Sequence, residues 1–591
     1  MSPHPFTPVH RTALALAITA AALPSLLAYN VSPSPTFLNQ ALALGLWGAW
    51  VWVCAPGLSV RGAAPLYAAL ALVAMGAAWS WGPGALPASL ALSAIGSLAA
   101  AAVLAAGGAG VRLRDARHDL FAAFCWAWLV AGLLNVGVAG VQVFLPEWPD
   151  GNWIAHSGYP GRAVGNLRQP NHLSSLLLWS CIAVVALLEL GRLGRRAAAL
   201  ALAALVFAVV LTASRTGLVS VLLLALWGLF DRRLSRPARG LLLAAPVIYA
   251  LSWLAMAQWA ALSQHAFGGS QRLAEGDISS SRFAIWRDTW ALIRMHPWAG
   301  VGFGDFNLAW TLTPFPHRAV AFFDHTHNLP LQLAVELGLP LASLVMALLL
   351  WALWRAARQA WATEGSEGTA LRSALMMVLM IGLHSLLEYP LWYSYFLLPA
   401  AWAFGFALHA PAVLGGKPGE PGASPRAAPG LRLAALAVVV GAALAVADYT
   451  RVAAIFSSTS DAPLEQRIAA GQRSLFFAHH ADYAEVTSGV PVRDPAHAFD
   501  RAAHYLLDTR LMMAWARSLA ERGELDAARH LAERLREFRN ADAKEFFEPC
   551  PQAASAAGAA SAASAAILGQ PFQCERPVKA PGWQAYLPQP R

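Results

Sequence analysis

The sequence predicts an all-α protein that crosses a membrane many times and carries a helical C-terminal domain on one side. Three observations lead to this fold class. The chain has 591 residues, 57% of them are hydrophobic and only 13% are charged, and the apolar residues gather in long runs. Soluble domains carry about 25% charged residues. So few charges argue against a soluble multidomain enzyme, and the high hydrophobicity argues against disorder.

About 13 apolar runs are long enough to cross a bilayer, for which a helix needs roughly 20 mostly apolar residues. The first run resembles the apolar core of a signal peptide, but Ala28-Tyr29-Asn30 at its end is a poor cleavage site, and we expect a span. The predicted spans lie at 12–29, 38–54, 63–79, 88–107, 119–145, 171–190, 197–211, 215–230, 240–261, 328–354, 372–388, 391–409 and 432–448.

Lys and Arg residues are distributed unevenly between the two predicted sides. One side holds basic clusters such as 192–196 and 232–239, whereas the short loops of the other side hold Arg162, Arg168 and Arg215. Basic loops stay in the cytoplasm. The distribution therefore predicts a bacterial inner-membrane protein with a cytoplasmic N-terminus and a periplasmic C-terminus. The same loops account for the net charge of +9, so we expect membrane lipid and no nucleic acid as a partner.

Two polar segments are predicted on the periplasmic side, the loop 262–326 and the tail 449–591. We therefore divide the chain into a transmembrane domain, residues 1–448, which includes the loop, and a C-terminal domain, residues 449–591. In the tail, apolar residues recur at helical spacing on both sides of Gly523, which predicts a helix–turn–helix similar to one tetratricopeptide (TPR) unit.

The tail also contains two cysteines, Cys550 and Cys574, on either side of the Ala/Ser-rich segment 553–568. Disulfides persist outside the cytoplasm, so we expect these two cysteines to be paired. The other three cysteines fall in predicted spans.

Polar residues at membrane depth are costly and usually mark function, and the first two such clusters flank predicted helices. Gly165-Asn-Leu-Arg-Gln-Pro-Asn-His172 opens a span, and Pro170 is typical of a helix start, so this cluster is either a helix cap or a set of donors for a sugar or phosphate. Thr212-Ala-Ser-Arg-Thr-Gly217 places Arg215 on the side that is poor in cations. Its guanidinium suits a pair of phosphate oxygens, or alternatively reaches lipid headgroups.

The third cluster is the serine-rich start of an amphipathic helix that carries Arg282, followed by the glycine run 300–304. Serines cap helices, and a helix N-terminus can hold an anion. No strand precedes the glycines, so we expect a turn and not a nucleotide loop, with backbone amides near a phosphate.

The fourth cluster is Asp324-His-Thr-His-Asn328, directly before a span. A histidine beside an aspartate suits general-base catalysis. Two histidines alone are too few for zinc, so we expect no metal. A last set, 384–393, contains Glu388, Tyr389 and Tyr393 and alternatively forms an aromatic belt at the membrane surface.

Together these motifs resemble the O-antigen ligase superfamily, and within it the bacterial protein O-oligosaccharyltransferases that glycosylate pilins. The resemblance rests on 165–172, 214–217, Ser281-Arg282 with Trp286, 325–328 and 388–393. It implies transfer of a glycan from undecaprenyl pyrophosphate to an acceptor hydroxyl on the periplasmic side, without a metal or other cofactor. The implied acceptor is lipid A-core for ligases, and a Ser or Thr of a pilin-like protein for the protein-directed members.

The resemblance also implies roles for individual residues. His327 matches the catalytic histidine of the family, and Arg215 and Arg282 match its phosphate-binding arginines. Arg168 departs from the family pattern, in which a small residue is expected, and would add a third cation. The remaining implied substrate-binding residues are Gln169, Asn171, His325, Asn328, and Tyr389 or Tyr393.

Alternative functions remain open at this point. A ligase to lipid A-core or a glycan polymerase would use the same donor. A polyprenol-glycan flippase or other transporter should carry its polar residues and broken helices at mid-membrane, whereas here they gather at one interface. The Ala/Ser-rich segment resembles acceptor regions, which suggests self-glycosylation at Ser555, Ser561 or Ser564; alternatively it is a surface helix or a linker.

Overall fold

The regular structure of this chain is helical throughout the part that the structure describes. The computed structural model describes residues 8–54, 57, 62–82, 86–270, 280–316, 318–319, 322–408, 428–458, 460–550 and 571–587, and these ranges contain no strand. The Ala/Ser-rich segment, with Ser555, Ser561 and Ser564, lies outside the described residues. The all-α prediction is confirmed.

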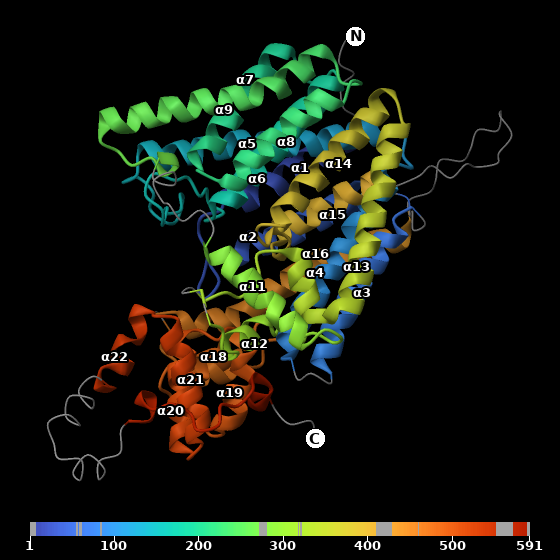
Figure 1. The fold of residues 1–591 in the computed structure, drawn as a ribbon. Coiled ribbons are helices and arrows are strands. Elements are labelled where there is room, and N and C mark those ends of the chain that lie inside the picture. Colours follow the sequence, from blue (N-terminus) through green and yellow to red (C-terminus); the bar gives the residue numbers. More distant parts are fainter. Residues whose placement is uncertain are drawn as a thin grey trace, which may run out of the picture. The chain divides into compact units, whose positions relative to one another are not determined.

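Every predicted span coincides with a helix (Figure 1). Nine helices of the described residues are long and apolar enough to cross a membrane: α2 (Phe37–Cys54), α3 (Ala64–Trp81), α4 (Ala88–Val111), α5 (Arg117–Phe144), α6 (Pro170–Glu189), α9 (Arg236–Ser263), α13 (Leu329–Ala362), α14 (Gly365–Ser385) and α16 (Pro429–Ala453). The helices at the other predicted spans are shorter or less apolar: α1 (Pro8–Leu26), α7 (Arg195–Leu211), α8 (Arg215–Phe230) and α15 (Ser394–Leu408). The chain therefore has the composition of a multi-pass membrane protein, while the number of crossings stays a prediction.

The chain forms two compact units. Unit 1 contains Met1–Ala71, Ser97–Gly276 and Met346–Val446. Unit 2 contains Leu72–Gly96, Asp277–Val345 and Ala447–Arg591, so it combines the tail with most of the polar loop. Helices α3, α4, α13 and α16 contribute residues to both units.

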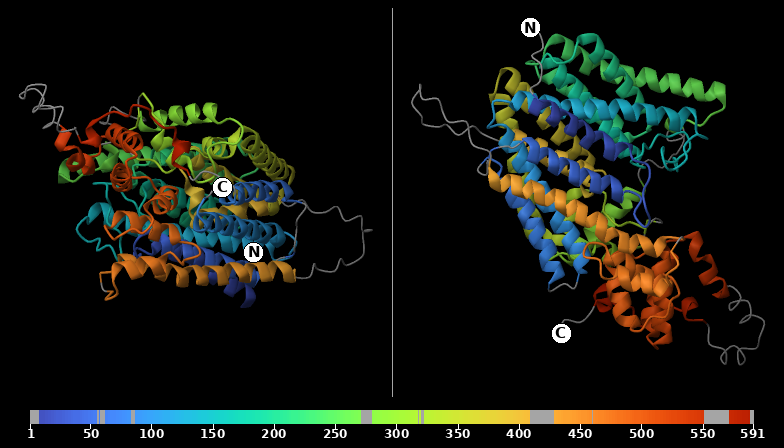
Figure 2. Two further views of the ribbon diagram at one scale, coloured as in Figure 1. Left: turned by 90° about the horizontal axis from the view of Figure 1, so that it is seen from below. Right: turned by 180° about the vertical axis from the view of Figure 1, so that it is seen from behind.

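Unit 1 is built around α6, which packs against α5, α7 and α14 (Figures 1 and 2). Buried aromatic rings fill its core: the ring centroids of Phe124 and Trp402 stack 4.4 Å apart, and those of Trp128 and Trp179 meet edge-on 4.7 Å apart.

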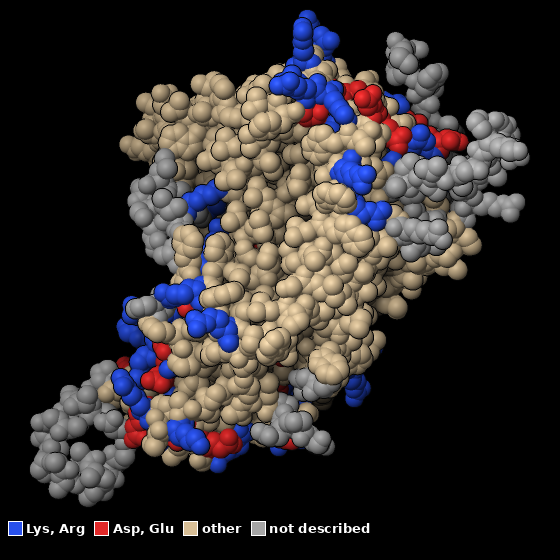
Figure 3. All heavy atoms as spheres, turned by 45° about the vertical axis from the view of Figure 1, so that its right-hand side comes forward, with Lys and Arg blue, Asp and Glu red and all other residues tan. Residues whose placement is uncertain are grey.

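On the face shown in Figure 3, a broad area of the surface carries no Lys, Arg, Asp or Glu side chains. Such a surface is what a lipid environment requires.

Two glycines bring the backbones of α4 and α15 into direct contact. A Cβ at Gly108 would lie 2.0 Å from the Trp402 carbonyl oxygen, and a Cβ at Gly405 would lie 1.9 Å from the Ala105 oxygen. Small residues permit such close helix packing in membranes, where the lipid supplies no hydrophobic driving force.

Unit 2 contains the helices α11 (Ser280–Met295), α12 (Phe306–Leu312), α17 (Leu464–Gly471), α18 (Ala478–Thr487), α19 (Pro495–Ala503), α20 (Thr509–Glu521), α21 (Leu525–Glu537) and α22 (Lys544–Phe547). Helices α20 and α21 pack together across a turn at Gly523, whose φ is +82°. The predicted helix–turn–helix is therefore present, and its likeness to a tetratricopeptide unit stays a prediction. Cys550 and Cys574 are joined by a disulfide, with their Cα atoms 5.2 Å apart.

The glycine run 300–304 forms a turn against a break in α13. The backbone amides of Val301 and Gly302 donate to the carbonyls of Val335 and Glu336 at 2.8 and 3.1 Å. Helix α13 is interrupted just beyond them, at Gly338. The predicted turn is therefore present. These two amides are occupied by the chain itself, and a phosphate near other amides of the run stays a prediction.

We predict that Gly108→Ala destabilises the protein, because the added methyl group collides with the backbone of α15. Overpacking of this kind costs about 1–3 kcal/mol, which should lower the melting temperature of the detergent-purified protein by several degrees. Gly96→Ala is the matched control in the same helix, because a Cβ at Gly96 meets nothing within 4 Å. Equal melting temperatures for the two variants would contradict the prediction.

Candidate functional site

Gln169 is the first of the predicted site residues in unit 1, where it is the N-cap of α6. Its backbone is extended, with φ −145° and ψ 121°, and its side-chain oxygen accepts a hydrogen bond from the His172 amide at 2.8 Å. The sequence allowed the cluster 165–172 to be either a helix cap or a set of donors for a ligand. The side-chain oxygen of Gln169 serves as a helix cap.

Asn171 connects three motifs that lie far apart in the sequence. Its amide nitrogen donates to the Glu388 carboxylate at 3.0 Å, and its side-chain oxygen accepts from the Ser214 hydroxyl at 2.6 Å. Ser214 in turn accepts from the Gly217 amide at 2.9 Å and so caps α8, the helix that begins at Arg215. The structure therefore brings Asn171, Glu388 and the Arg215 turn together within unit 1.

Asn166 has a structural role instead of the predicted one. This buried side chain donates to the carbonyls of Leu26 and Trp153 at 2.5 and 2.9 Å, and accepts from the Ala155 amide at 2.9 Å. All three partners are backbone groups, so the expectation that Asn166 offers a donor to a sugar or phosphate was wrong.

Two arginines donate hydrogen bonds to backbone carbonyls beside these motifs. Arg168, the expected third cation, donates to the Ala28 carbonyl at 2.7 Å. Arg162, which the sequence analysis did not select, is buried and donates to the Thr212 carbonyl at 3.0 Å, directly before the Arg215 turn. The sequence feature that could have indicated Arg162 is its location, because the short loops of the predicted periplasmic side contain few arginines.

Tyr393 of the last motif packs against His172, and Tyr389 stacks on Tyr393. The Tyr393 ring lies 4.6 Å from the His172 ring and stacks with Tyr389 at 6.2 Å. Tyr395, which sequence reasoning missed, is buried, and its hydroxyl lies 3.1 Å from Nδ1 of His172. Tyr389 and Tyr393 are both half-buried, so burial does not separate the two candidates.

In unit 2, Thr326 holds the two histidines that flank it. Thr326 is fully buried; its amide donates to Gln332 at 2.8 Å, and its hydroxyl donates to the Asn328 carbonyl at 2.9 Å. Its carbonyl accepts from the Trp286 indole at 2.9 Å. Trp286 belongs to α11, the helix that carries Arg282, so this bond joins the third and fourth motifs.

The neighbours of Thr326 have distinct surroundings. The Asp324 carboxylate lies 3.1 Å from Nδ1 of His325. Burial favours a raised pKa of Asp324, but His325, the Asp324 backbone amide and His327 together lower that pKa. The His327 ring meets the Phe323 ring edge-on at 5.4 Å. Asn328 accepts from the Leu331 amide at 3.0 Å and so caps the start of α13.

Backbone strain coincides with the motifs. Of the five non-glycine residues with positive φ in the described part of the chain, Arg168, Ala213 and His327 lie within predicted motifs, with φ of 60°, 49° and 55°. This region costs a residue with a side chain about 1–3 kcal/mol and persists where the surroundings enforce it, as at functional sites. The predicted residues thus form two internally connected groups, one in each unit.

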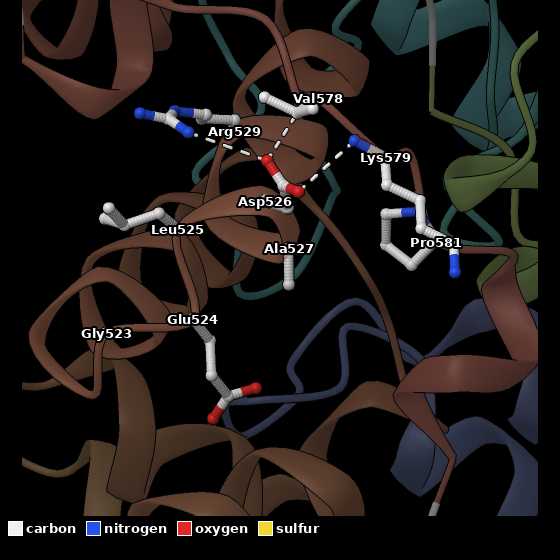
Figure 4. A pocket seen from close by; sticks show the side chains of 9 residues that line it. All are labelled: Gly523, Glu524, Leu525, Asp526, Ala527, Arg529, Val578, Lys579 and Pro581. Atoms are coloured by element: carbon white, nitrogen blue, oxygen red, sulfur yellow. Dashed lines mark hydrogen bonds and ion pairs between the residues drawn. The ribbon is translucent and has the colours of Figure 1, made fainter.

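Two further features lie apart from these groups. A cavity of about 560 Å³ opens at the start of α21, where the Asp526 carboxylate accepts from the amides of Val578 and Lys579 (Figure 4). None of the predicted site residues lines it. Among the described residues, no group of three His, Cys, Asp or Glu side chains could hold a metal.

Three family models match the chain over the segments that contain the motifs. A model described as protein glycosylation ligase matches residues 163–188, one described as O-antigen ligase matches 200–346, and one described as virulence factor membrane-bound polymerase, C-terminal, matches 372–547. The first contains Asn171, the second contains Arg215, Arg282 and His327, and the third extends from the last motif into the tail.

Two curated relatives from Acinetobacter baylyi match 260 residues each. A general O-oligosaccharyltransferase is 27% identical over 42% of this chain and 44% of its own length. A ComP-specific O-oligosaccharyltransferase is 28% identical over 43% of this chain and 45% of its own length. The match thus spans less than half of each relative. These findings confirm the resemblance that the motifs indicated: the chain is similar to the O-antigen ligases and, among them, to the protein O-oligosaccharyltransferases.

Proposed function

We propose that the protein transfers a glycan from undecaprenyl pyrophosphate to Ser or Thr hydroxyls of periplasmic proteins such as a pilin. The observation that carries this proposal is the match to a protein glycosylation ligase at 163–188. It falls on the segment in which Asn171 bonds to Glu388 and to the cap of the Arg215 helix. The two relatives named O-oligosaccharyltransferases support the same activity.

In the proposed reaction, His327 acts as the general base. The acceptor oxygen attacks the anomeric carbon of the glycan while its proton passes to the imidazole of His327. The bond from that carbon to the pyrophosphate oxygen breaks, and its electron pair leaves with the pyrophosphate. Direct attack inverts the anomeric centre.

Arg215 and Arg282 are the proposed partners of the departing pyrophosphate, so that no metal is needed. Preorganised positive groups at the position where charge develops are often the largest catalytic contribution. The planar guanidinium can donate two parallel hydrogen bonds to phosphate oxygens. Arg215 is the first residue of α8, and Arg282 lies in the first turn of α11.

A second candidate is ligation to lipid A-core or polymerisation of the glycan, which the match to a membrane-bound polymerase at 372–547 favours. Deletion of the gene in the native host separates the two. We expect the intact mass of a periplasmic acceptor protein to fall by the mass of a glycan, while the banding of lipopolysaccharide stays the same. Altered lipopolysaccharide with unchanged protein masses would instead establish the second candidate.

We predict that His327→Ala lowers the rate of transfer by about 10²–10⁴, the usual contribution of a general base. The measurement is transfer of a lipid-linked glycan to a Ser-containing peptide by the purified protein, alongside binding of the glycan donor, which should persist. His325→Ala serves as the matched variant and should be milder. An inactive His325→Ala together with a nearly normal His327→Ala would reverse the assignment.

We also predict that Arg215→Lys and Arg282→Lys are strongly impaired, because lysine keeps the charge but loses the paired donors. Arg294→Lys is the control, since Arg294 is an exposed residue near the end of the same helix as Arg282. Transfer by the unmodified protein should be insensitive to EDTA. Activity that EDTA removes and a divalent ion restores would refute the metal-independent mechanism.

A further inference from the structure

The segment that contains the candidate base is attached to the C-terminal region of the chain within unit 2. We refer to residues 322–328 as the His segment. It follows α12 in the chain, and both α12 and the His segment contact residues between 504 and 538.

Asn307, in the first turn of α12, bridges these two parts directly. Its side-chain nitrogen donates to the Phe323 carbonyl at 2.8 Å, and its side-chain oxygen accepts from the Leu507 amide at 2.7 Å. The side chain is 5% exposed. The Phe323 ring is also the ring that meets His327 edge-on. One buried amide therefore links the turn between α19 and α20 to the residue that packs against His327.

An ion pair beside Asn307 makes the same connection. The Asp305 carboxylate, directly before α12, lies 2.6 Å from Nδ1 of His504, and both side chains are buried. Burial by itself would lower the pKa of His504, but the carboxylates of Asp305 and Asp500 together raise that pKa. The pair fixes the start of α12 against the end of α19.

The other side of the His segment is anchored at the end of α21. The Phe322 ring stacks on Phe538 with centroids 3.9 Å apart. Arg318, whose side chain is 1% exposed, donates to Glu537 at 2.8 Å and to the Trp310 carbonyl at 2.8 Å. Phe322 thus contacts the C-terminal region directly, and its neighbour Phe323 is linked to another part of that region through Asn307.

We infer that Asn307 is a positioning residue for His327, and that the C-terminal region therefore supports the catalytic step itself as well as any acceptor binding. This inference rests on the proposed function. His327 has a positive φ, which persists only where neighbouring contacts enforce it. The Asn307 bridge supplies such a contact, and its loss would remove the partner of the buried Leu507 amide and of the partly buried Phe323 carbonyl.

The test compares Asn307→Ala with the full-length wild-type protein in detergent, using a lipid-linked glycan and a Ser-containing acceptor peptide. We expect kcat to fall about tenfold to hundredfold, because a misplacement of about 1 Å can cost a hundredfold. KM for the peptide should change by less than about twofold. Asp494→Ala is the matched control, since it removes a helix cap in the same region without contact to the His segment, and it should leave kcat unchanged.

Asn307→Asp keeps the proposal testable if Asn307→Ala does not fold. It retains the acceptor for the Leu507 amide but places an oxygen against the Phe323 carbonyl, so we expect a similar loss of kcat. A raised KM with unchanged kcat would assign the region to acceptor binding alone and overturn the inference.

Hydrogen exchange of the His segment supplies a readout that does not require activity. Its amides should exchange at least tenfold faster in Asn307→Ala than in the wild type and the Asp494→Ala control. If the wild type transfers no glycan, the proposed function fails, whereas faster exchange still supports the link through Asn307. Unchanged exchange, or faster exchange with an unchanged kcat in an active protein, overturns the inference.

Discussion

The hydrogen bonds of Asn171 are the interaction on which the group of predicted residues in unit 1 depends. One side-chain amide contacts Glu388, more than 200 positions later in the chain, and also the cap of the helix that begins at Arg215. In an environment of low dielectric constant, a buried polar group without partners is costly, and a fully satisfied network is rigid. The same bonds that satisfy these groups therefore fix the relative positions of the three motifs.

Thr326 provides the equivalent constraint in unit 2. All of its polar groups are bonded, and its partners come from α11, from α13 and from its own loop. Because Thr326 is held in this way, the backbone of its two neighbours, His325 and His327, has little freedom to move. In each unit, a small polar side chain thus forms hydrogen bonds that orient its larger neighbours: the half-buried Asn171 in unit 1 and the buried Thr326 in unit 2.

Several motif residues could be read from the sequence either as helix caps or as ligand-binding residues, and the structure shows why. Gln169, Ser214 and Asn328 each accept a hydrogen bond from an amide in the first turn of the helix that follows. Helices in a membrane must satisfy these amides at their ends, because the first turn has no partners within the helix. In these motifs, the residue that caps the helix also orients the neighbouring candidate functional group.

The sequence by itself determined the helical fold, the positions of the apolar helices and the motifs, because apolar runs and cap residues act over a few consecutive positions. It did not reveal Arg162, Tyr395 or Asn307, whose partners lie at Thr212, His172, and Phe323 and Leu507. It also left Asn166 open as a donor to a ligand, although backbone groups from two other segments occupy its side-chain nitrogen. Whether a buried amide serves the fold or a substrate depends on which distant backbone groups approach it, and only the tertiary structure decides that.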